Sequence, residues 1–240
     1  MNLRRAAALA LVGWYLVAAL VIAMPPFVLA ADQHELTIPL DKGTTWNYSG
    51  TARWWGLTKP EEYGARTSRI RDWQMKVMKT ARRGDVTASV VQGFPDELAW
   101  YEGDAVPPPT GLTLIVQSST GLFVKSISSD ETEQRLADAL DHKLKFDVDP
   151  DQILRFPVHV DDCLSTEPLA LKYKRWCWHV RTTVKTRFGS GWELEYRTNP
   201  DQQLIDIVPG VGVTRYVYHH NGTVADTDVH LVRLPGESRK

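Results

Sequence analysis

Short runs of β-branched and aromatic residues recur along most of the chain, and each is bounded by Gly, Pro, Asn or Asp. Such runs are typical of strands, because branched and aromatic side chains pack well on a pleated surface. We therefore expect a mainly β fold, with a large curved antiparallel sheet or an open barrel. The predicted strands are residues 36–40, 44–55, 70–80, 86–92, 94–101, 112–117, 122–127, 173–186, 192–197, 203–207, 213–219 and 223–234.

The strongest turn signal is the Asn-Gly pair at residues 221–222, between the last two predicted strands. A type I′ turn needs positive φ at both central positions, which Asn and Gly tolerate. A two-residue turn at this place puts Arg215 opposite Asp228. Aromatic and aliphatic side chains then share one face of the hairpin, and charged side chains share the other.

One segment, residues 130–143, has the period of a helix instead. Leu136, Leu140 and Leu144 are spaced by four residues and fall on one helical face. Ser128 and Glu131 stand at capping-box spacing at its start. We expect a helix whose apolar side packs over an opening or a face of the sheet.

The first 30 residues have the order of a secretory signal peptide. Arg4 and Arg5 precede an uncharged apolar stretch at 6–24, and two prolines and a Val-Leu-Ala site follow. Cleavage after Ala30 leaves residues 31–240 as a single β-rich exported domain, periplasmic or secreted. The apolar stretch approaches the length that spans a bilayer, so an uncleaved helix that anchors the protein to the inner membrane is the alternative.

Positive and negative charges are balanced and interspersed, with 28 basic and 29 acidic residues and a formal net charge of −1. A nucleic-acid-binding domain normally carries a basic face, because phosphate contacts dominate its affinity. We therefore expect no nucleic-acid partner, and contact with a membrane only through the N-terminal segment.

Two cysteines, Cys163 and Cys177, lie in the part of the chain that is predicted to be exported. Disulfides form and persist outside the cytoplasm, so we expect a Cys163–Cys177 bridge. Two free thiols are the alternative. His179 stands two residues after Cys177, but a bridge removes that thiol as the nucleophile of a Cys–His pair.

Asp226, Asp228 and His230 alternate along the last predicted strand, so their side chains point to one side of it. Together with His219 on the partner strand they resemble a set of metal ligands. Arg215 falls within this group, where its positive charge opposes a cation and favours an ion pair with Asp228. We therefore expect a solvated polar face and no metal site.

Two glycine motifs lack the context that phosphate binding or catalysis requires. Residues 210–212 read Gly-Val-Gly, but a dinucleotide fingerprint needs a helix after it, and a strand follows here. Residues 189–191 read Gly-Ser-Gly between two predicted strands, without the glycine spacing of a nucleophile elbow. The sequence predicts turns at both places, no catalytic residue and no cofactor.

The adjacent aromatic residues Trp54 and Trp55 are the candidate ligand-binding residues. In a strand their side chains point to opposite faces, so at least one meets solvent or a ligand. Exposed aromatic side chains on a curved sheet bind apolar or sugar-like ligands. A plug in the core or at the barrel end is the alternative.

Large side chains also alternate in four predicted strands, which predicts an aromatic concave face that one short helix cannot cover. This face would be the working surface of the protein. A sheet that closes on itself, with these residues as an ordinary core, is the alternative. The pairs are Trp46 and Tyr48, Trp73 and Met75, Trp176 and Trp178, and Tyr216 and Tyr218.

The two ends of the domain carry a pattern of their own. Residues 38–50 follow the order apolar-Pro-Leu-x-x-Gly-x-x-Trp-x-Tyr, and residues 208–213 read Val-Pro-Gly-Val-Gly-Val before the final hairpin. The pattern resembles that of uncharacterised exported bacterial β-rich proteins of the TapB/DUF3108-like kind. The resemblance implies a strongly curved antiparallel sheet with a packed helix, distantly like the half-barrels of lipoprotein carriers. It carries over no functional residue.

These observations favour a non-enzymatic envelope module that binds an apolar small molecule or an envelope protein. The alternative is a hydrolase with a carboxylate pair dispersed in the sequence. A pocket lined by aromatic side chains without convergent Asp, Glu or His favours binding. Two carboxylates that face each other across the pocket favour the enzyme.

Overall fold

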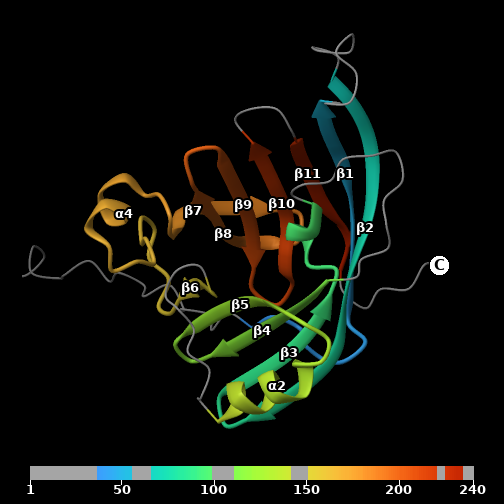
Figure 1. The fold of residues 1–240 in the computed structure, drawn as a ribbon, viewed down its shortest axis with the longest axis vertical. Helices are drawn as coiled ribbons and strands as arrows, with labels where there is room; N and C mark the ends of the chain where they lie inside the picture. Colours follow the sequence, from blue (N-terminus) through green and yellow to red (C-terminus); the bar gives the residue numbers. More distant parts are fainter. Residues whose placement is uncertain (1–36, 56–65, 99–110, 142–150, 221–224, 235–240) are drawn as a thin grey trace, which may run out of the picture. The chain divides into compact units, whose positions relative to one another are not determined.

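Figure 1 shows the computed structural model, which describes residues 37–55, 66–98, 111–141, 151–220 and 225–234. The predicted signal segment, residues 1–30, lies outside the described residues, and so does the Asn-Gly pair at 221–222. The elements described below all belong to one compact unit, Glu35–Lys240. Within the described residues, no helix is both long enough and apolar enough to cross a membrane.

Eleven strands in the described residues form a single antiparallel sheet, which confirms the mainly β prediction. Their spatial order is β6-β5-β4-β3-β2-β1-β11-β10-β9-β8-β7, so two meanders extend in opposite directions from the pair β1 and β11. In chain order they are β1 (Thr45–Trp55), β2 (Arg66–Arg83), β3 (Val86–Gln92), β4 (Leu112–Ser118), β5 (Gly121–Ile127), β6 (Gln152–Arg155), β7 (Trp178–Thr186), β8 (Gly189–Arg197), β9 (Asp201–Val208), β10 (Gly212–His220) and β11 (Ala225–Arg233).

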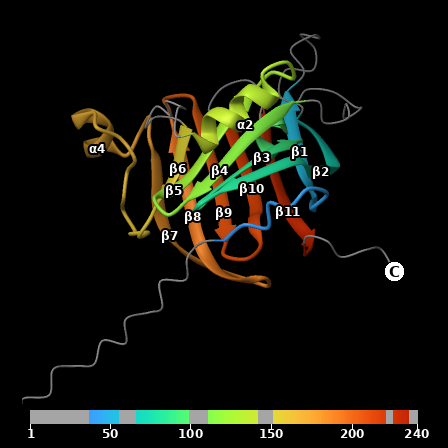
Figure 2. The same ribbon diagram turned by 90° about the horizontal axis from the view of Figure 1, so that it is seen from below.

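The long strand β2 pairs with two different strands along its length. Its residues 66–76 pair with β1, and its residues 76–83 pair with β3. A register shift between Val77 and Lys79 follows the point where the partner changes. Such an irregularity increases the local twist, and the sheet curves until its edge strands, β6 and β7, approach each other (Figure 2). The curved, nearly closed sheet agrees with the sequence prediction.

Helical turns replace parts of two predicted strands. Residues 94–98 contain the 3₁₀ helix η2 (Pro95–Leu98), because Pro is favoured at the first helical position and two acidic residues follow in the first turn. Residues 99–101 lie outside the described residues. The strand expected from residue 173 begins only at Trp178, because α4 (Pro168–Tyr173) and a loop precede it.

Two shorter predictions were also wrong. Residues 37–40 do not form a strand, and residues 189–191 open β8 instead of forming a turn. Gly191 allows this close pairing, since a Cβ there would lie 2.0 Å from the Ile207 carbonyl oxygen. The turn expected at residues 210–212 is present, and its two glycines have φ of 75° and 95°, a conformation that favours glycine.

The register of the β10–β11 hairpin differs from the predicted one. Arg215 lies opposite His230, whereas a two-residue turn at 221–222 would place it opposite Asp228. Because the difference is two residues, every side chain keeps its predicted face. The tyrosines of β10 are buried, and Arg215 reaches Asp228 diagonally across the outer face.

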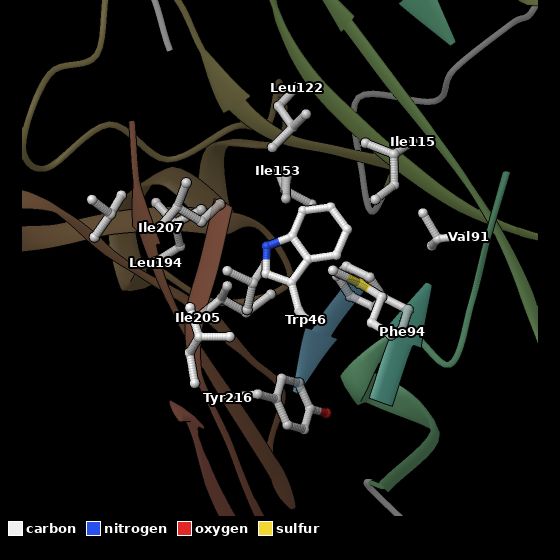
Figure 3. Close-up of a cluster of buried hydrophobic side chains, with 14 of the residues drawn as sticks. Trp46, Val91, Phe94, Ile115, Leu122, Ile153, Leu194, Ile205, Ile207 and Tyr216 are labelled. Carbon is white, nitrogen blue, oxygen red and sulfur yellow. The ribbon is translucent and has the colours of Figure 1, made fainter. Parts of the chain in front are cut away.

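The core lies inside the curve of the sheet and is built around Trp46, which has no exposed surface. Figure 3 shows Trp46 between apolar side chains of both meanders, among them Ile115 of β4 and Ile207 of β9. Its indole N–H donates a hydrogen bond of 2.7 Å to the Val211 carbonyl oxygen. The predicted open aromatic face is therefore mostly an ordinary core; its buried members are Trp46, Tyr48, Trp73, Met75, Trp178, Tyr216 and Tyr218.

The helix α2 (Thr132–Leu140) packs on the face of β3 and β4 opposite this core (Figures 1 and 2). Leu136 and Ala139 contact a second apolar cluster on those strands. The Glu131 carboxylate accepts a hydrogen bond of 2.7 Å from the Ser128 hydroxyl and a longer one of 3.4 Å from its backbone N–H. The predicted helix is confirmed, and it covers the outside of one meander.

Candidate functional site

A partly open cavity of about 450 Å³ lies where the two edges of the sheet approach each other, a place that we call the seam. Side chains of β6 and of the neighbouring β5 form one wall, and side chains of β7, β8 and β9 form the other. The residues that line it are Phe94, Asp96, Val124, Lys125, Ser126, Asp151, Ile153, Trp178, Tyr196, Gln203 and Ile205.

The shortness of β6 creates room for this cavity. In the described residues β6 pairs with Gly121–Phe123 of β5, and the next residues, 124–126, border the cavity. On the opposite wall, the period of two along β9 directs both Gln203 and Ile205 toward the cavity. The two meanders thus meet at their ends with strands of unequal length, and no strand of the described residues fills the space between them.

An aromatic pair forms part of the apolar surface of the cavity. Trp178 of β7 and Tyr196 of β8 are register partners on neighbouring strands. Their ring centroids are 5.5 Å apart and their planes are tilted by 47°, a favourable arrangement for two aromatic rings. With Ile153 and Ile205 they offer an apolar surface to a hydrocarbon chain or a ring.

An ion pair lies in the wall formed by β5 and β6. The Lys125 ammonium stands 2.7 Å from the carboxylate of Asp151, the residue before β6. The Asp151 side chain is only 10% exposed, so water screens this pair less than it screens a surface pair. Because the two charges neutralise each other, the pair provides polar contacts without a net charge.

Asp96, in η2, brings a second carboxyl group to the cavity. Burial raises the pKa of Asp96 to about 7, and the negative charge of neighbouring Glu97 adds to this effect. Near neutral pH the carboxyl group is therefore present in both protonation states. The protonated form donates a hydrogen bond and the ionised form attracts a cation, so Asp96 can contact either kind of polar group.

The raised pKa of Asp96 predicts that the protein loses stability as the pH rises. In the unfolded chain the carboxyl group loses its proton near its ordinary pKa of 3.8, whereas in the folded chain it keeps the proton up to about 7. Between these values the folded state binds more protons, so the free energy of unfolding falls from about pH 4 to about pH 7. Urea unfolding across this range should show a shallower fall for Asp96→Asn than for wild type.

Two further variants check the origin of this pH dependence. Burial also raises the pKa of Asp206 to about 6, so Asp206→Asn should flatten the fall at the lower pH values. Asp72 is exposed on β2, and Asp72→Asn should follow the wild-type curve. Parallel curves for wild type and Asp96→Asn would contradict the assignment of the pH effect to Asp96.

No family model matches this chain. No curated protein matches it either. One similar solved structure is that of a Bacteroides fragilis protein described as a presumed exported protein with a YmcC-like fold, at 11% sequence identity and a TM-score of 0.39. The match covers 85% of this chain and 100% of that protein. At these values the likeness carries no conclusion about function, and the resemblance to TapB/DUF3108-like proteins stays a prediction.

The two predicted disulfide cysteines are joined. Cys163 and Cys177 form a disulfide, and the described residues contain no free cysteine. The bridge closes the loop that leads from β6 to β7, so it lies beside the seam. Cys177 is therefore not available as the nucleophile of a pair with His179.

The predicted ligand-binding residues Trp54 and Trp55 lie at the end of β1, where their backbones pair with Thr67 and Arg66 of β2. Their side chains lie outside what the structure describes. Their part in ligand binding therefore stays a prediction.

The side chains of the candidate metal cluster on the last hairpin contact one another and Arg215. The Arg215 guanidinium donates hydrogen bonds of 3.1 and 2.9 Å to the two Asp228 carboxylate oxygens. The Asp226 carboxylate contacts His219, and His230 stands 3.1 Å from Asp228. Each acidic side chain of the group thus contacts a basic side chain of the same hairpin.

Sequence reasoning missed most of the cavity. Asp96 was not identified as a cavity residue, because residues 94–101 were predicted to form a strand. Pro followed by Asp-Glu is instead typical of the start of a helix. Lys125 and Asp151 are separated by a long stretch of sequence and carry no local motif. Trp178 was identified as an inward-facing residue, but alternation alone does not distinguish a core position from a cavity wall.

Proposed function

We propose that this chain is an exported protein that binds an amphipathic small molecule in the seam cavity. The observation that supports it best is the cavity itself, which combines a mostly apolar lining with a few polar groups. Its volume of about 450 Å³ falls within the range of small-molecule sites. The ligand is held between the meanders and is not changed chemically.

The two kinds of lining residue suggest how such a ligand lies. Trp178, Tyr196 and Ile205 contact its apolar part, since burial of apolar surface supplies most of the affinity. The Lys125–Asp151 pair and Asp96 contact its polar end and set its orientation. A purely apolar ligand would leave the polar groups without partners, so the lining favours a molecule with a polar head.

Two features support export: the N-terminal segment and the disulfide. Arg4 and Arg5 before the apolar stretch at 6–24 have the order of an export signal. The Cys163–Cys177 disulfide suits an oxidising compartment. We propose that the domain comprises residues 31–240 and acts in the periplasm or outside the cell.

Hydrolysis is the second candidate function, because two carboxyl groups line the same cavity. Asp96, with its raised pKa, has the property of a general acid, and Asp151 would act as the second carboxylate. We favour binding, because Asp151 is already engaged by Lys125. A bound ligand that is converted by wild type and recovered intact from Asp96→Asn would favour the enzyme.

Filling the mouth of the cavity should abolish ligand binding. Ser126 is exposed and lines the cavity, so Ser126→Trp places a large ring in the ligand's path with little effect on the core. A fluorescent fatty-acid analogue titrated into wild type should saturate, and Ser126→Trp should bind it at least about tenfold more weakly. The protein for this titration is purified from an envelope fraction. Its intact mass should equal that of a chain that begins at Ala31.

The matched control is Ser190→Trp, which changes an exposed strand serine of β8 outside the cavity lining and should bind the probe as wild type does. In the same titration, weaker binding by Trp54→Ala or Trp55→Ala would extend the site to the end of β1. No saturable binding at micromolar protein, or equal binding by Ser126→Trp, would contradict the cavity site. An intact mass equal to that of the chain from Met1 would show that the N-terminal segment is retained as an anchor.

A further inference from the structure

The loop that connects the two edges of the sheet is closed by the Cys163–Cys177 disulfide and carries α4 at its tip (Figure 1). Its first arm pairs with β7, since the Leu164 N–H donates a hydrogen bond of 2.8 Å to the Trp178 carbonyl oxygen. Its second arm is tied to β8 by a bond of 2.7 Å from the Trp176 N–H to the Arg197 carbonyl oxygen. We call residues 163–177 the disulfide loop, which has a fixed base.

Large apolar side chains are exposed on the disulfide loop. Leu169, Leu171, Tyr173 and Trp176 are 64%, 43%, 56% and 42% exposed. Four of the nine exposed large apolar residues in the described part of the chain thus fall within a stretch of eight residues. Trp176 was expected on the concave face beside Trp178, but the chain turns there with a positive φ of 57° and its side chain remains outside.

Basic residues are interleaved with these apolar ones. Lys172 is exposed and its ammonium lies 5.0 Å from the centre of the Tyr173 ring. Lys174 and Arg175 follow directly, and each is held by a hydrogen bond to a neighbouring segment. Glu167 is the single acidic residue between the two cysteines. Between the two cysteines the loop therefore combines an apolar surface with three basic residues and one acidic residue.

We propose that the disulfide loop docks the protein on an anionic phospholipid surface. Leu169 and Leu171 enter the boundary between head groups and acyl chains, where Tyr and Trp side chains are also favoured. Lys172 extends toward the lipid phosphates while its methylene groups remain against the apolar surface. This contact is additional to the one expected from the N-terminal segment.

The size of the exposed patch favours a lipid surface over a protein partner. A stable protein interface buries about 800 Å² on each partner and involves about 20 residues of each. The exposed apolar residues here occupy one short stretch of a single loop, whereas insertion into lipid needs no complementary surface. The charge pattern complements anionic head groups. Docking would also bring the seam close to the membrane, because the loop joins the two strands that border it.

Vesicle sedimentation tests the proposal with residues 31–240, which contain every described strand, the core and the disulfide. The oxidised protein should bind phosphatidylcholine vesicles that contain phosphatidylglycerol and bind pure phosphatidylcholine vesicles much less, and added salt should weaken the binding. Leu169→Ser should lower the affinity about tenfold and Lys172→Glu at least about fivefold. Both side chains are exposed, so the variants should keep the wild-type circular dichroism spectrum.

Matched controls distinguish binding through the disulfide loop from non-specific binding of the protein to vesicles. Ile70 on β2 is 77% exposed and Lys185 on β7 is exposed, so Ile70→Ser and Lys185→Glu should bind vesicles as wild type does. Ser126→Trp should also bind them normally, because docking does not depend on an occupied cavity. Equal losses for Leu169→Ser and Ile70→Ser would overturn the proposal. Absence of binding to the anionic vesicles would also overturn it. Capture of a protein through the loop would then indicate a protein partner in place of lipid.

Discussion

Replacing Trp46 with alanine should lower the free energy of unfolding by about 3–5 kcal/mol, the largest effect expected for a single substitution in this chain. The indole is fully buried between the two meanders, and its N–H bonds the Val211 carbonyl oxygen, so the change leaves both a large cavity and an unpaired acceptor. Since domains of this size are stable by about 5–15 kcal/mol, Trp46→Ala should remove a substantial part of the total stability. Urea unfolding followed by circular dichroism measures the difference.

Trp176→Ala is the matched control for this substitution. Trp176 is 42% exposed and lies on the disulfide loop, so its removal should change the free energy of unfolding by less than about 1 kcal/mol. A similar loss of stability for the two variants would show that Trp46 does not hold the meanders together. Trp46→Phe should lie between wild type and Trp46→Ala, because it keeps most of the apolar volume but not the hydrogen bond.

Removing the disulfide should have the second largest effect. The Cys163→Ser, Cys177→Ser double variant loses a cross-link that spans 14 residues, and in the chain-entropy account such a loop contributes about 3 kcal/mol by restricting the unfolded chain. Both half-cystines are buried, so the serines also place polar groups among apolar neighbours. Urea unfolding of the oxidised protein and of the double variant measures the loss.

Two measurements test whether the bridge is present and whether it stabilises the protein. Thiol titration of the denatured, unreduced protein should find no free thiol, because both cysteines are in the bridge. A reducing agent should destabilise wild type by about as much as the double substitution and should leave the double variant unchanged. Two reactive thiols in the unreduced protein would refute the bridge, and equal stability of wild type and the double variant would refute its contribution.

The local pattern of the sequence was enough to predict the class of fold and several of its parts. Runs of β-branched and aromatic residues predicted strands such as β1, β3 and β4, because such side chains pack well on a pleated surface. The four-residue spacing of Leu136 and Leu140 predicted α2, because residues four apart lie on the same face of a helix. The disulfide was predicted because the chain has two cysteines, both in the part expected to be exported.

Features that depend on which strands meet were decided only by the tertiary structure. The β10–β11 register differs by two residues from the predicted one, and alternation cannot detect such a shift because both registers bury the same side chains. Burial of the aromatic face depends on the curvature that begins where β2 changes partner, near Lys76. No local pattern encodes that change.

The seam cavity shows the same division most clearly. Its walls come from Asp96, Lys125, Asp151, Trp178 and Gln203, which are far apart in the sequence and belong to different strands or turns. The sequence determined the inward face of individual strands, since that depends on neighbouring residues. Only the meeting of β6 and β7 decided which inward side chains border a cavity and which fill the core, because that depends on the length and curvature of the whole sheet.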